Sequence, residues 1–263
     1  MPALIFDCDG VLAETERDGH RVAFNETFAE VGLPVSWSVE EYGEKLLIGG
    51  GKERMSSLLT PAFVAANRLP TDPDSQGALI VDLHRRKTAK YTAMVAGGQL
   101  ATRPGVARIA AEAIDAGWAV AVASTSAEAS VRAVLQHAVG TTMASRFEVF
   151  AGDIVRAKKP SPAIYELALE RLRMQAADAI VIEDSRNGLL AAVGAGLRCV
   201  VTVSGYTQGE DMREAVLVVS SLGDPGEPAT VLADQVNVRP GELVRLADLD
   251  LCRTQPLRNK EAA

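Results

Sequence analysis

Two carboxylates close to the N-terminus directly follow a short hydrophobic run. The run Ala3–Phe6 stops at Asp7, and Asp9 and Gly10 come immediately afterwards. Carboxylates this near to each other repel, and each loses hydration if it is buried. The pair therefore predicts that a metal ion, or a basic side chain from elsewhere in the chain, compensates the two charges.

Three later hydrophobic runs are also followed by polar side chains. Ligands bind at the carboxyl ends of the strands in open parallel sheets, so these side chains are expected to meet at one edge. Clustered carboxylates suit Mg²⁺, because this ion prefers oxygen ligands. The candidates are Ser124, Thr125 and Ser126 after Trp118–Ala123, Lys159 on a loop after Phe147–Phe150, and Glu183 and Asp184 after Ala179–Ile182.

This set of acids, hydroxyls and a lysine is suited to phosphoryl transfer. A carboxylate beside a metal ion can attack phosphorus and form an aspartyl-phosphate. A second carboxylate can protonate the departing oxygen and later deprotonate a water molecule. Ser124 and the backbone N–H groups of a helix that begins near it can hold the phosphoryl oxygens.

The elements that would position these residues alternate along the chain. The hydrophobic runs, with a fifth at Arg198–Val203, are rich in Val, Ile and Ala and show no polar alternation, which is typical of strands buried on both faces of a parallel sheet. Helix-like segments separate them, so the pattern predicts an α/β fold with right-handed crossovers. These segments are Val106–Ala116, Ala127–Ala138, Pro162–Leu172 and Gly188–Ala195.

The stretch between the first and second strands interrupts this alternation. From about Glu16 to about Gly98 the sequence has helical spacing of apolar residues and a capping box at Ser38-x-x-Glu41, with helices expected at Arg54–Leu59 and Asp82–Val95. Turns are expected at Thr60-Pro61 and at 70–73. We therefore expect residues 1–15 and 99–223 to form the core, residues 16–98 an inserted helical domain, and residues 224–263 an extension that packs on the core and ends loosely.

Composition limits the partners and the location. The formal net charge is −7, from 27 basic and 34 acidic side chains, so neither nucleic acid nor a membrane is expected as a partner. The three cysteines, Cys8, Cys199 and Cys252, have no metal-ligand spacing, which favours a reducing compartment. The first apolar run is too short for a signal peptide. We expect a cytoplasmic monomer, or a protein of the plastid stroma if a transit peptide has been removed.

The four motifs together resemble a known superfamily. The motifs D-x-D-G-V at Asp7, the hydroxyl after the second strand, K-P-x-P at Lys159 and E-D-S at Glu183 resemble those of haloacid dehalogenase superfamily phosphatases and phosphomutases. The resemblance implies a Rossmann-like parallel sheet core with an inserted α-helical cap domain. It implies Asp7 as nucleophile and Mg²⁺ ligand, Asp9 as general acid/base and carbonyl ligand, Ser124, Thr125 and Lys159 as phosphoryl-binding groups, and Glu183 and Asp184 as metal ligands, directly or through water.

The resemblance extends to the CbbY-like group. It rests on Glu14–Phe28, Ile48–Met55, Ala151–Asp153 and Ser204–Thr207. It implies a phosphatase acting on xylulose-1,5-bisphosphate, a sugar bisphosphate that needs a second anion site in the cap. Lys52 and Arg54, after three glycines, are candidates for that site, and Glu16, His20 and Tyr42 for contacts to the sugar.

Other interpretations stay open. A β-phosphoglucomutase-type phosphomutase and a phosphoglycolate phosphatase would share the core motifs, and a regulatory protein without activity is conceivable on the same fold. Each candidate residue also has a structural alternative. Thr125-x-x-Glu128 resembles a capping box, Glu183 and Asp184 could be helix N-terminal charges, and Lys52, Arg54 and Lys159 could be solvated surface residues.

Overall fold

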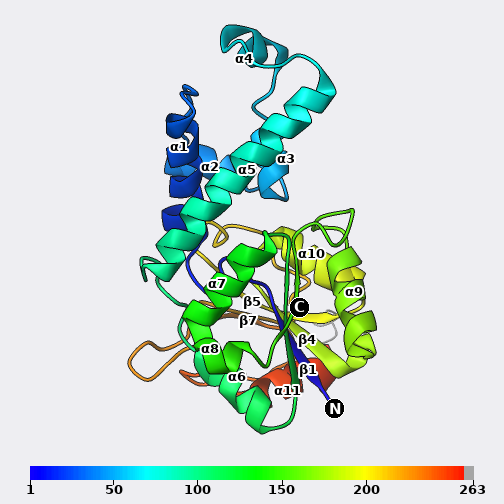
Figure 1. Cartoon of the computed structure of the whole chain (residues 1–263). Coiled ribbons are helices and arrows are strands. Elements are labelled where there is room, and N and C mark those ends of the chain that lie inside the picture. Colours follow the sequence, from blue (N-terminus) through cyan, green and yellow to red (C-terminus); the bar gives the residue numbers. More distant parts are fainter. Residues whose placement is uncertain (258–263) are drawn as a thin grey trace. The chain divides into compact units, whose positions relative to one another are not determined.

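The computed structural model describes residues 1–257 and separates into two compact units (Figure 1). The core unit consists of Met1–Glu14 and the chain from Ala101 onward, and the cap unit is Thr15–Leu100. The finer division into residues 1–15 with 99–223, 16–98 and 224–263 stays a prediction, and part of its loose end lies outside the described residues.

The core unit contains a seven-stranded sheet in the order β3-β2-β1-β4-β5-β6-β7. All neighbouring pairs are parallel except β6 and β7. This confirms the predicted α/β class, and the five predicted strands agree with β1 to β5 to within one residue at each end. The strands are β1 Ala3–Phe6, β2 Ala119–Ser124, β3 Glu148–Ala151, β4 Ala179–Glu183, β5 Arg198–Thr202, β6 Leu217–Val219 and β7 Val231–Asp234.

Strand β1 lies at the centre of the parallel part of the sheet. Leu4 pairs with Val120 of β2 on one side and with Ile180 of β4 on the other. Every residue of β1 is fully buried, which explains why the run has no polar alternation. The polar ends of β1, β2 and β4 consequently lie side by side at one edge of the sheet.

Helices cover both faces of this sheet. Helices α9 (Ala163–Leu172) and α10 (Arg186–Gly194) contact each other and contribute Tyr165 and Leu189 to the hydrophobic cluster that also holds Ile5 and Val181. Helix α6 contacts both α7 and α11, and α6, α7 and α11 contact strands of the sheet without joining that cluster, so they lie on the other face. The remaining helical segments of the core unit are α6 Val106–Asp115, α7 Glu128–Val139, α8 Thr141–Ala144, η2 Ala176–Asp178 and α11 Leu246–Thr254.

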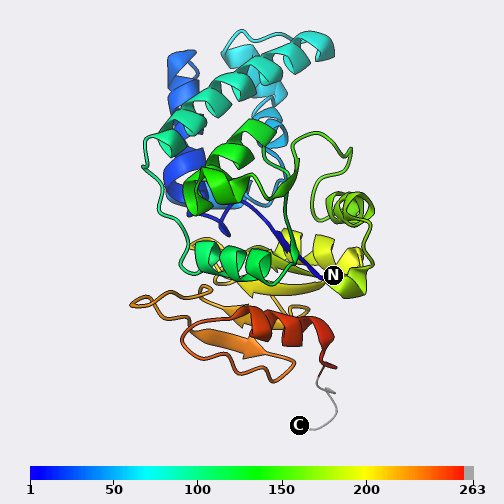
Figure 2. The same cartoon turned by 60° about the horizontal axis from the view of Figure 1, so that its bottom comes forward.

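The C-terminal part of the described chain extends the sheet, which the sequence does not predict. Strands β6 and β7 continue the sheet beyond β5, and α11 contacts β4 and β5 (Figure 2). Leu249 and Cys252 of α11 are fully buried, while Leu251 is exposed. The chain after 224 therefore packs on the core through the pairing of β7 with β6 and through one face of α11, with Val236 and Val244 also buried.

The cap unit is helical throughout its regular structure. An aromatic cluster joins its first helices, since Phe24 and Phe28 of α1 each lie about edge-on to Trp37, with ring centroids 5.1 and 5.0 Å apart. Tyr42 of α2 packs 5.9 Å from Phe24. The elements are the π-helical turn η1 Glu16–His20, α1 Arg21–Glu30, α2 Val39–Lys45, α3 Gly51–Ser56, α4 Pro61–Ala66 and α5 Pro73–Ala96.

Helix boundaries in the cap unit follow capping groups. The capping box at Ser38 and Glu41 is confirmed. Helix α5 begins at Pro73, well before the predicted Asp82, because Asp72 accepts a hydrogen bond from Ser75 N at 2.8 Å and Pro73 occupies the first turn. The turn predicted at Thr60-Pro61 is wrong for the same reason, since Thr60 caps α4.

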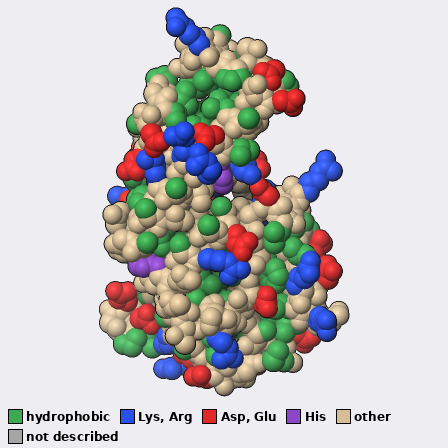
Figure 3. Space-filling view, viewed as in Figure 1, with side chains coloured by type: hydrophobic (Ala, Val, Ile, Leu, Met, Phe, Trp, Pro, Cys, Tyr) green, Lys and Arg blue, Asp and Glu red, His purple; other side chains and the backbone are tan. Residues whose placement is uncertain are grey.

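Charges of both signs alternate on the surface. Acidic and basic side chains stand next to one another at several places on the face drawn in Figure 3. In the cap unit such neighbours form the pairs Arg86–Asp82 and Lys90–Glu30, both at 2.7 Å. Within residues 1–257, no helix combines the length and apolar composition that crossing a membrane requires.

Candidate active site

The first aspartate lies where β1 ends. Asp7 is buried, and its N–H still donates to the Ile182 carbonyl of β4 at 2.8 Å. The chain then turns sharply, because Leu12 N donates to the Cys8 carbonyl and Gly10 has a φ of +77°. Asp7 is thus held at the edge of the sheet by strand β1 before it and by the turn after it.

Lys159 supplies the basic side chain that the paired aspartates require. Its ammonium lies 2.5 Å from Asp7 Oδ1 and 2.6 Å from Glu183 Oε1, and it also donates to the Ala123 carbonyl at 2.9 Å. Lys159 is only 8% exposed, so the interpretation as a solvated surface lysine is wrong. Lys158 points elsewhere and donates to the Gly152 carbonyl and to Asp153.

Glu183, the last residue of β4, is enclosed on all sides. Its carboxylate accepts hydrogen bonds from Lys159, from Tyr165 Oη at 2.6 Å and from Asp184 N at 3.1 Å. Gly188 of α10 makes room for it, because a Cβ there would lie 2.0 Å from the carboxylate. Glu183 is 0% exposed, so it does not act as a solvated charge at the N-terminus of α10.

Asp184 is placed by two neighbouring loops. Its Oδ2 accepts a hydrogen bond from Ser204 Oγ at 2.8 Å, and Ser204 is itself joined to Thr207. A Cβ at Gly10 would come within 2.1 Å of the same oxygen. The turn after β1 and the loop after β5 therefore both close on this carboxylate.

Asp9 and the hydroxyl cluster after β2 also meet. Ser126 Oγ donates to Asp9 Oδ2, and Ser126 N donates to Ser124 Oγ at 3.1 Å. Thr125 is half-buried between them. The proposed capping box at Thr125 is wrong, because the N-cap of α7 is Ala127 and no side chain caps it.

The electrostatics of this cluster reflect its burial. Loss of hydration raises the pKa of the Asp7 carboxyl from its ordinary 3.8 to about 8, since burial together with repulsion from Glu183 and Asp9 outweighs the attraction of Lys159. For Lys159, burial disfavours the charge, but attraction to Asp7 and Glu183 outweighs that cost and raises its pKa above the ordinary value.

The donor set fits a divalent cation. One carboxylate oxygen from each of Asp7, Glu183 and Asp184 lies within 4.8 Å of the others, and all three residues are buried. Three buried carboxylates beside one lysine carry an excess of negative charge, and repulsion from Glu183 adds to the desolvation that raises the pKa of Asp7. An oxygen-only set of this kind matches the preference of Mg²⁺.

In the cap unit the structure brings three predicted residues together. Tyr42 Oη donates to Glu16 Oε2 at 2.5 Å, and Arg54 Nη1 donates to Tyr42 Oη at 3.0 Å. Arg54 also forms an ion pair with Glu16 at 3.6 Å and donates to the Ile48 carbonyl at 3.0 Å. Arg54 is therefore part of a hydrogen-bonded network and is not a solvated side chain on α3.

His20 belongs to a second cluster of the cap unit. It is 2% exposed, its ring stacks on Tyr91 with centroids 3.9 Å apart, and Lys87 Nζ lies 2.5 Å from its Nδ1. Lys87 is buried over the rings of Phe24 and Tyr91. An ammonium only donates, so a charged Lys87 in this contact requires His20 Nδ1 as the acceptor.

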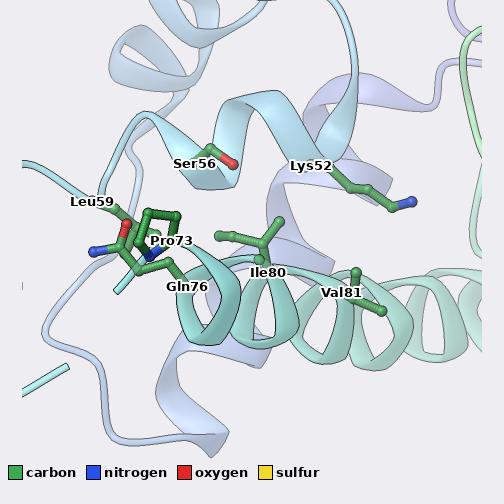
Figure 4. Close-up of a pocket in the computed structure, with 8 residues that line it drawn as sticks. Lys52, Ser56, Leu59, Pro73, Gln76, Ile80 and Val81 are labelled. Carbon is green, nitrogen blue, oxygen red and sulfur yellow. The ribbon is translucent and has the colours of Figure 1, made fainter. Parts of the chain in front are cut away.

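Lys52 lies at the border of a cap groove of about 480 Å³ between α3 and the first turns of α5. Figure 4 shows its ammonium directed away from the end of the groove where Ser56, Leu59 and Pro73 lie.

Two residues of the site, Ser204 and Tyr165, are absent from the predicted set. Ser126 was predicted only as a member of the hydroxyl cluster after the second strand, and the structure gives it a contact to Asp9. Ser204 follows β5 and lies in a motif already used for the resemblance. Tyr165 has no signal of its own, because an aromatic residue on the buried face of a helix ordinarily predicts core packing. The chemical roles of all site residues stay predictions.

Comparison with known proteins agrees with the family that the motifs resemble. The family description "haloacid dehalogenase-like hydrolase" matches residues 1–196. A "CBBY-like protein" of Arabidopsis thaliana is 46% identical over 231 residues, which are 88% of this chain and 72% of that protein. "Protein CbbY" of Cereibacter sphaeroides is 44% identical over 86% of this chain and 94% of its own.

A solved structure covers nearly the whole chain. It is the crystal structure of an aspartate-to-asparagine mutant of CbbY from Rhodobacter sphaeroides in complex with xylulose-1,5-bisphosphate. The TM-score is 0.77 at 40% sequence identity, and the match covers 95% of this chain and 100% of that chain.

Proposed function

Because the chain belongs to the haloacid dehalogenase-like hydrolase family, we propose that it is a Mg²⁺-dependent phosphatase that hydrolyses the 1-phosphate of xylulose-1,5-bisphosphate through an aspartyl-phosphate. The family makes it a hydrolase, and the CbbY relatives make it a sugar-phosphate phosphatase. Three parts of the proposal go beyond what these relatives establish: the choice of this bisphosphate, the metal and the covalent intermediate. They are supported by the bisphosphate bound to the related CbbY and by the cluster around Asp7.

In the first half-reaction, a carboxylate oxygen of Asp7 attacks phosphorus. The bond between phosphorus and the sugar oxygen breaks, and Asp9 gives its proton to that oxygen. The hydrogen bond from Ser126 holds the Asp9 carboxyl in place for this transfer. Lys159 and Ser124, at the ends of their loop and strand, are suited to hold the phosphoryl oxygens.

In the second half-reaction, water hydrolyses the aspartyl-phosphate. Asp9, now deprotonated, takes a proton from the water, whose oxygen attacks phosphorus, and Asp7 leaves as the carboxylate. Asp7, Glu183 and Asp184, with the Asp9 carbonyl, would hold Mg²⁺, which when bound supplies positive charge that neutralises the phosphate and keeps Asp7 ionised. The positive charge of Lys159 offsets the repulsion between the carboxylates of Asp7 and Glu183, since the lysine bonds to both.

The cap residues are proposed to recognise the rest of the substrate. Glu16, whose carboxylate is fixed by Tyr42 and Arg54, is suited to accept hydrogen bonds from sugar hydroxyls. His20 is suited to donate from Nε2, because Lys87 occupies Nδ1. Lys52 and Arg54 are the two basic residues proposed for the second phosphate.

The observation that carries this proposal is the ion-paired cluster Asp7–Lys159–Glu183, all buried, at the end of the central strand. The test is release of inorganic phosphate from a panel of xylulose-1,5-bisphosphate, sugar monophosphates, β-glucose 1-phosphate and phosphoglycolate with Mg²⁺. We expect the highest kcat/KM for the bisphosphate.

Three outcomes would change the assignment. Equal or higher turnover of a monophosphate would remove xylulose-1,5-bisphosphate as the substrate. Isomerised glucose phosphate without net phosphate release would replace the phosphatase by a phosphomutase, and no turnover of any ester with Mg²⁺ would favour a regulatory role.

A further inference from the structure

The environment of Glu183 assigns a role to a residue outside the core motifs. We propose that Tyr165 is a positioning residue of the metal site, and that its hydroxyl, together with Lys159, holds one oxygen of the Glu183 carboxylate and so turns the other toward the cation. This inference rests on the proposed function, because it concerns the same site.

The first support is the placement of the tyrosine hydroxyl. Tyr165 lies in the first turn of α9, is 0% exposed, and contributes its ring to the hydrophobic cluster on that face of the sheet. Its hydroxyl donates to Glu183 Oε1 at 2.6 Å. A buried hydroxyl without a partner costs about 1–3 kcal/mol, so the ring position and the carboxylate position are coupled. A phenylalanine would pack equally well here and would avoid that requirement.

The second support is the unequal distribution of donors on the carboxylate. Oε1 accepts from both Tyr165 and Lys159, at 2.6 Å each, whereas the Asp184 N–H contacts Oε2 at 3.1 Å. Two strong, charge-assisted donors on one oxygen fix the torsion of the carboxylate plane. The backbone of Gly188 lies directly against the carboxylate, since a Cβ there would come within 2.0 Å of it. Oε2 is left as the oxygen that the set Asp7, Glu183 and Asp184 can offer to a cation.

The third support is that Tyr165 contacts both members of an ion pair. The Lys159 ammonium lies 4.9 Å from the centre of the Tyr165 ring, within the range of a cation–π contact. Lys159 divides its hydrogen bonds between Asp7 and Glu183. Without the tyrosine hydroxyl, Glu183 would depend on a lysine that the reaction also needs.

The test separates the hydroxyl from the ring. Tyr165→Phe keeps the ring over Lys159 and removes the hydrogen bond to Glu183. Binding of Mn²⁺ to the full chain, measured by electron paramagnetic resonance of the free ion, is expected to weaken about tenfold, the lower end of the effect of such supporting residues. Phosphate release should lose more activity at limiting than at saturating Mg²⁺.

The matched control removes a different buried hydroxyl. Thr27→Val deletes a hydroxyl that donates to the Ala23 carbonyl within α1 of the cap unit, and it should leave the Mn²⁺ affinity unchanged. The thermal unfolding midpoint of each variant identifies a loss of fold. The proposal is overturned if Tyr165→Phe binds Mn²⁺ within twofold of the unaltered protein, whether or not its midpoint falls. If the unaltered protein itself binds no Mn²⁺, the metal dependence in the proposed function fails instead.

Discussion

The two aspartates after β1 have different surroundings, which suit them to different chemical roles. Asp7 and Asp9 are close in sequence but have different partners, since Asp7 bonds to Lys159 and Asp9 to Ser126. Their environments therefore separate a buried carboxylate suited to attack from a half-buried one suited to move protons.

The covalent mechanism makes a direct prediction for the first carboxylate. Asp7→Asn removes the attacking charge but keeps the shape and the contact distance to Lys159. We expect kcat to fall at least about a thousandfold, as for the loss of other nucleophiles, with an unchanged circular dichroism spectrum. Activity above a tenth of the original would rule out an aspartyl-phosphate at this residue.

Burial of Asp7 also predicts how the stability of the metal-free protein depends on pH. The pKa of Asp7 is raised from 3.8 to about 8, so between these values the folded protein keeps a proton that the unfolded chain has released. This contribution is fully present below pH 3.8 and is lost as the pH rises toward 8. Asp7→Asn should therefore become progressively more stable than the unaltered protein over this range, and the difference should level off above it.

Urea unfolding in the presence of a chelator, repeated across that pH range, measures the difference. A constant difference at every pH would mean that the Asp7 pKa is the same in the folded and unfolded states. Addition of Mg²⁺ should suppress the effect, because a cation favours the ionised carboxylate.

At the scale of secondary structure elements, burial decides what the sequence predicts. Strand β1 is apolar throughout, β2 and β4 are apolar up to their last residue, and all three were predictable because both of their faces are covered. Strand β7 has the burial pattern of an exposed edge, with Leu232 55% exposed, and β6 has only three residues. Neither offers a pattern long enough to recognise. Helix α5 was predicted too short, because a proline such as Pro73 is common both in the first turn of a helix and in a loop.

The candidate site was predictable for a related reason. Asp7, Ser124 and Glu183 lie at or just after the ends of neighbouring parallel strands, so sequence position alone places them at one edge. Tyr165 and Ser204 act through contacts between segments that are distant in sequence, which no local pattern encodes.

Close packing between α10 and β4 gives a prediction at this scale. Gly188→Ala would place a methyl group 2.0 Å from the Glu183 carboxylate, which has no room to withdraw. We expect a loss of about 1–3 kcal/mol in the free energy of unfolding together with weaker Mn²⁺ binding. Denaturant titration and metal titration of the same variant measure both effects.

The matched control lies in the long helix of the cap unit. A Cβ at Gly77 of α5 meets no atom within 4 Å, so Gly77→Ala should be neutral or stabilise by up to about 1 kcal/mol through helix propensity. Equal destabilisation by the two substitutions would show that the Glu183 carboxylate is not confined as described.

For the whole molecule, the position of the proposed metal-binding carboxylates within one unit has a measurable consequence. Asp7, Glu183 and Asp184 all belong to the core unit. Mg²⁺ at about a hundred times its Kd should stabilise that unit by about 2.7 kcal/mol. Hydrogen exchange should therefore slow in β1 and β4 when Mg²⁺ is added without substrate, while α5 of the cap unit exchanges as before. Equal slowing in both units would contradict a site confined to the core unit.

The central position of β1 also bears on how the chain is made. Leu4 leaves the ribosome before the cap unit, yet its partners Val120 and Ile180 emerge only after the whole cap unit has been synthesised. Pairing over such separations carries a large loop-closure entropy and is slow. The strand that leads to Asp7 is thus translated before its partner strands and completed late, and until then its apolar residues depend on other protection from aggregation.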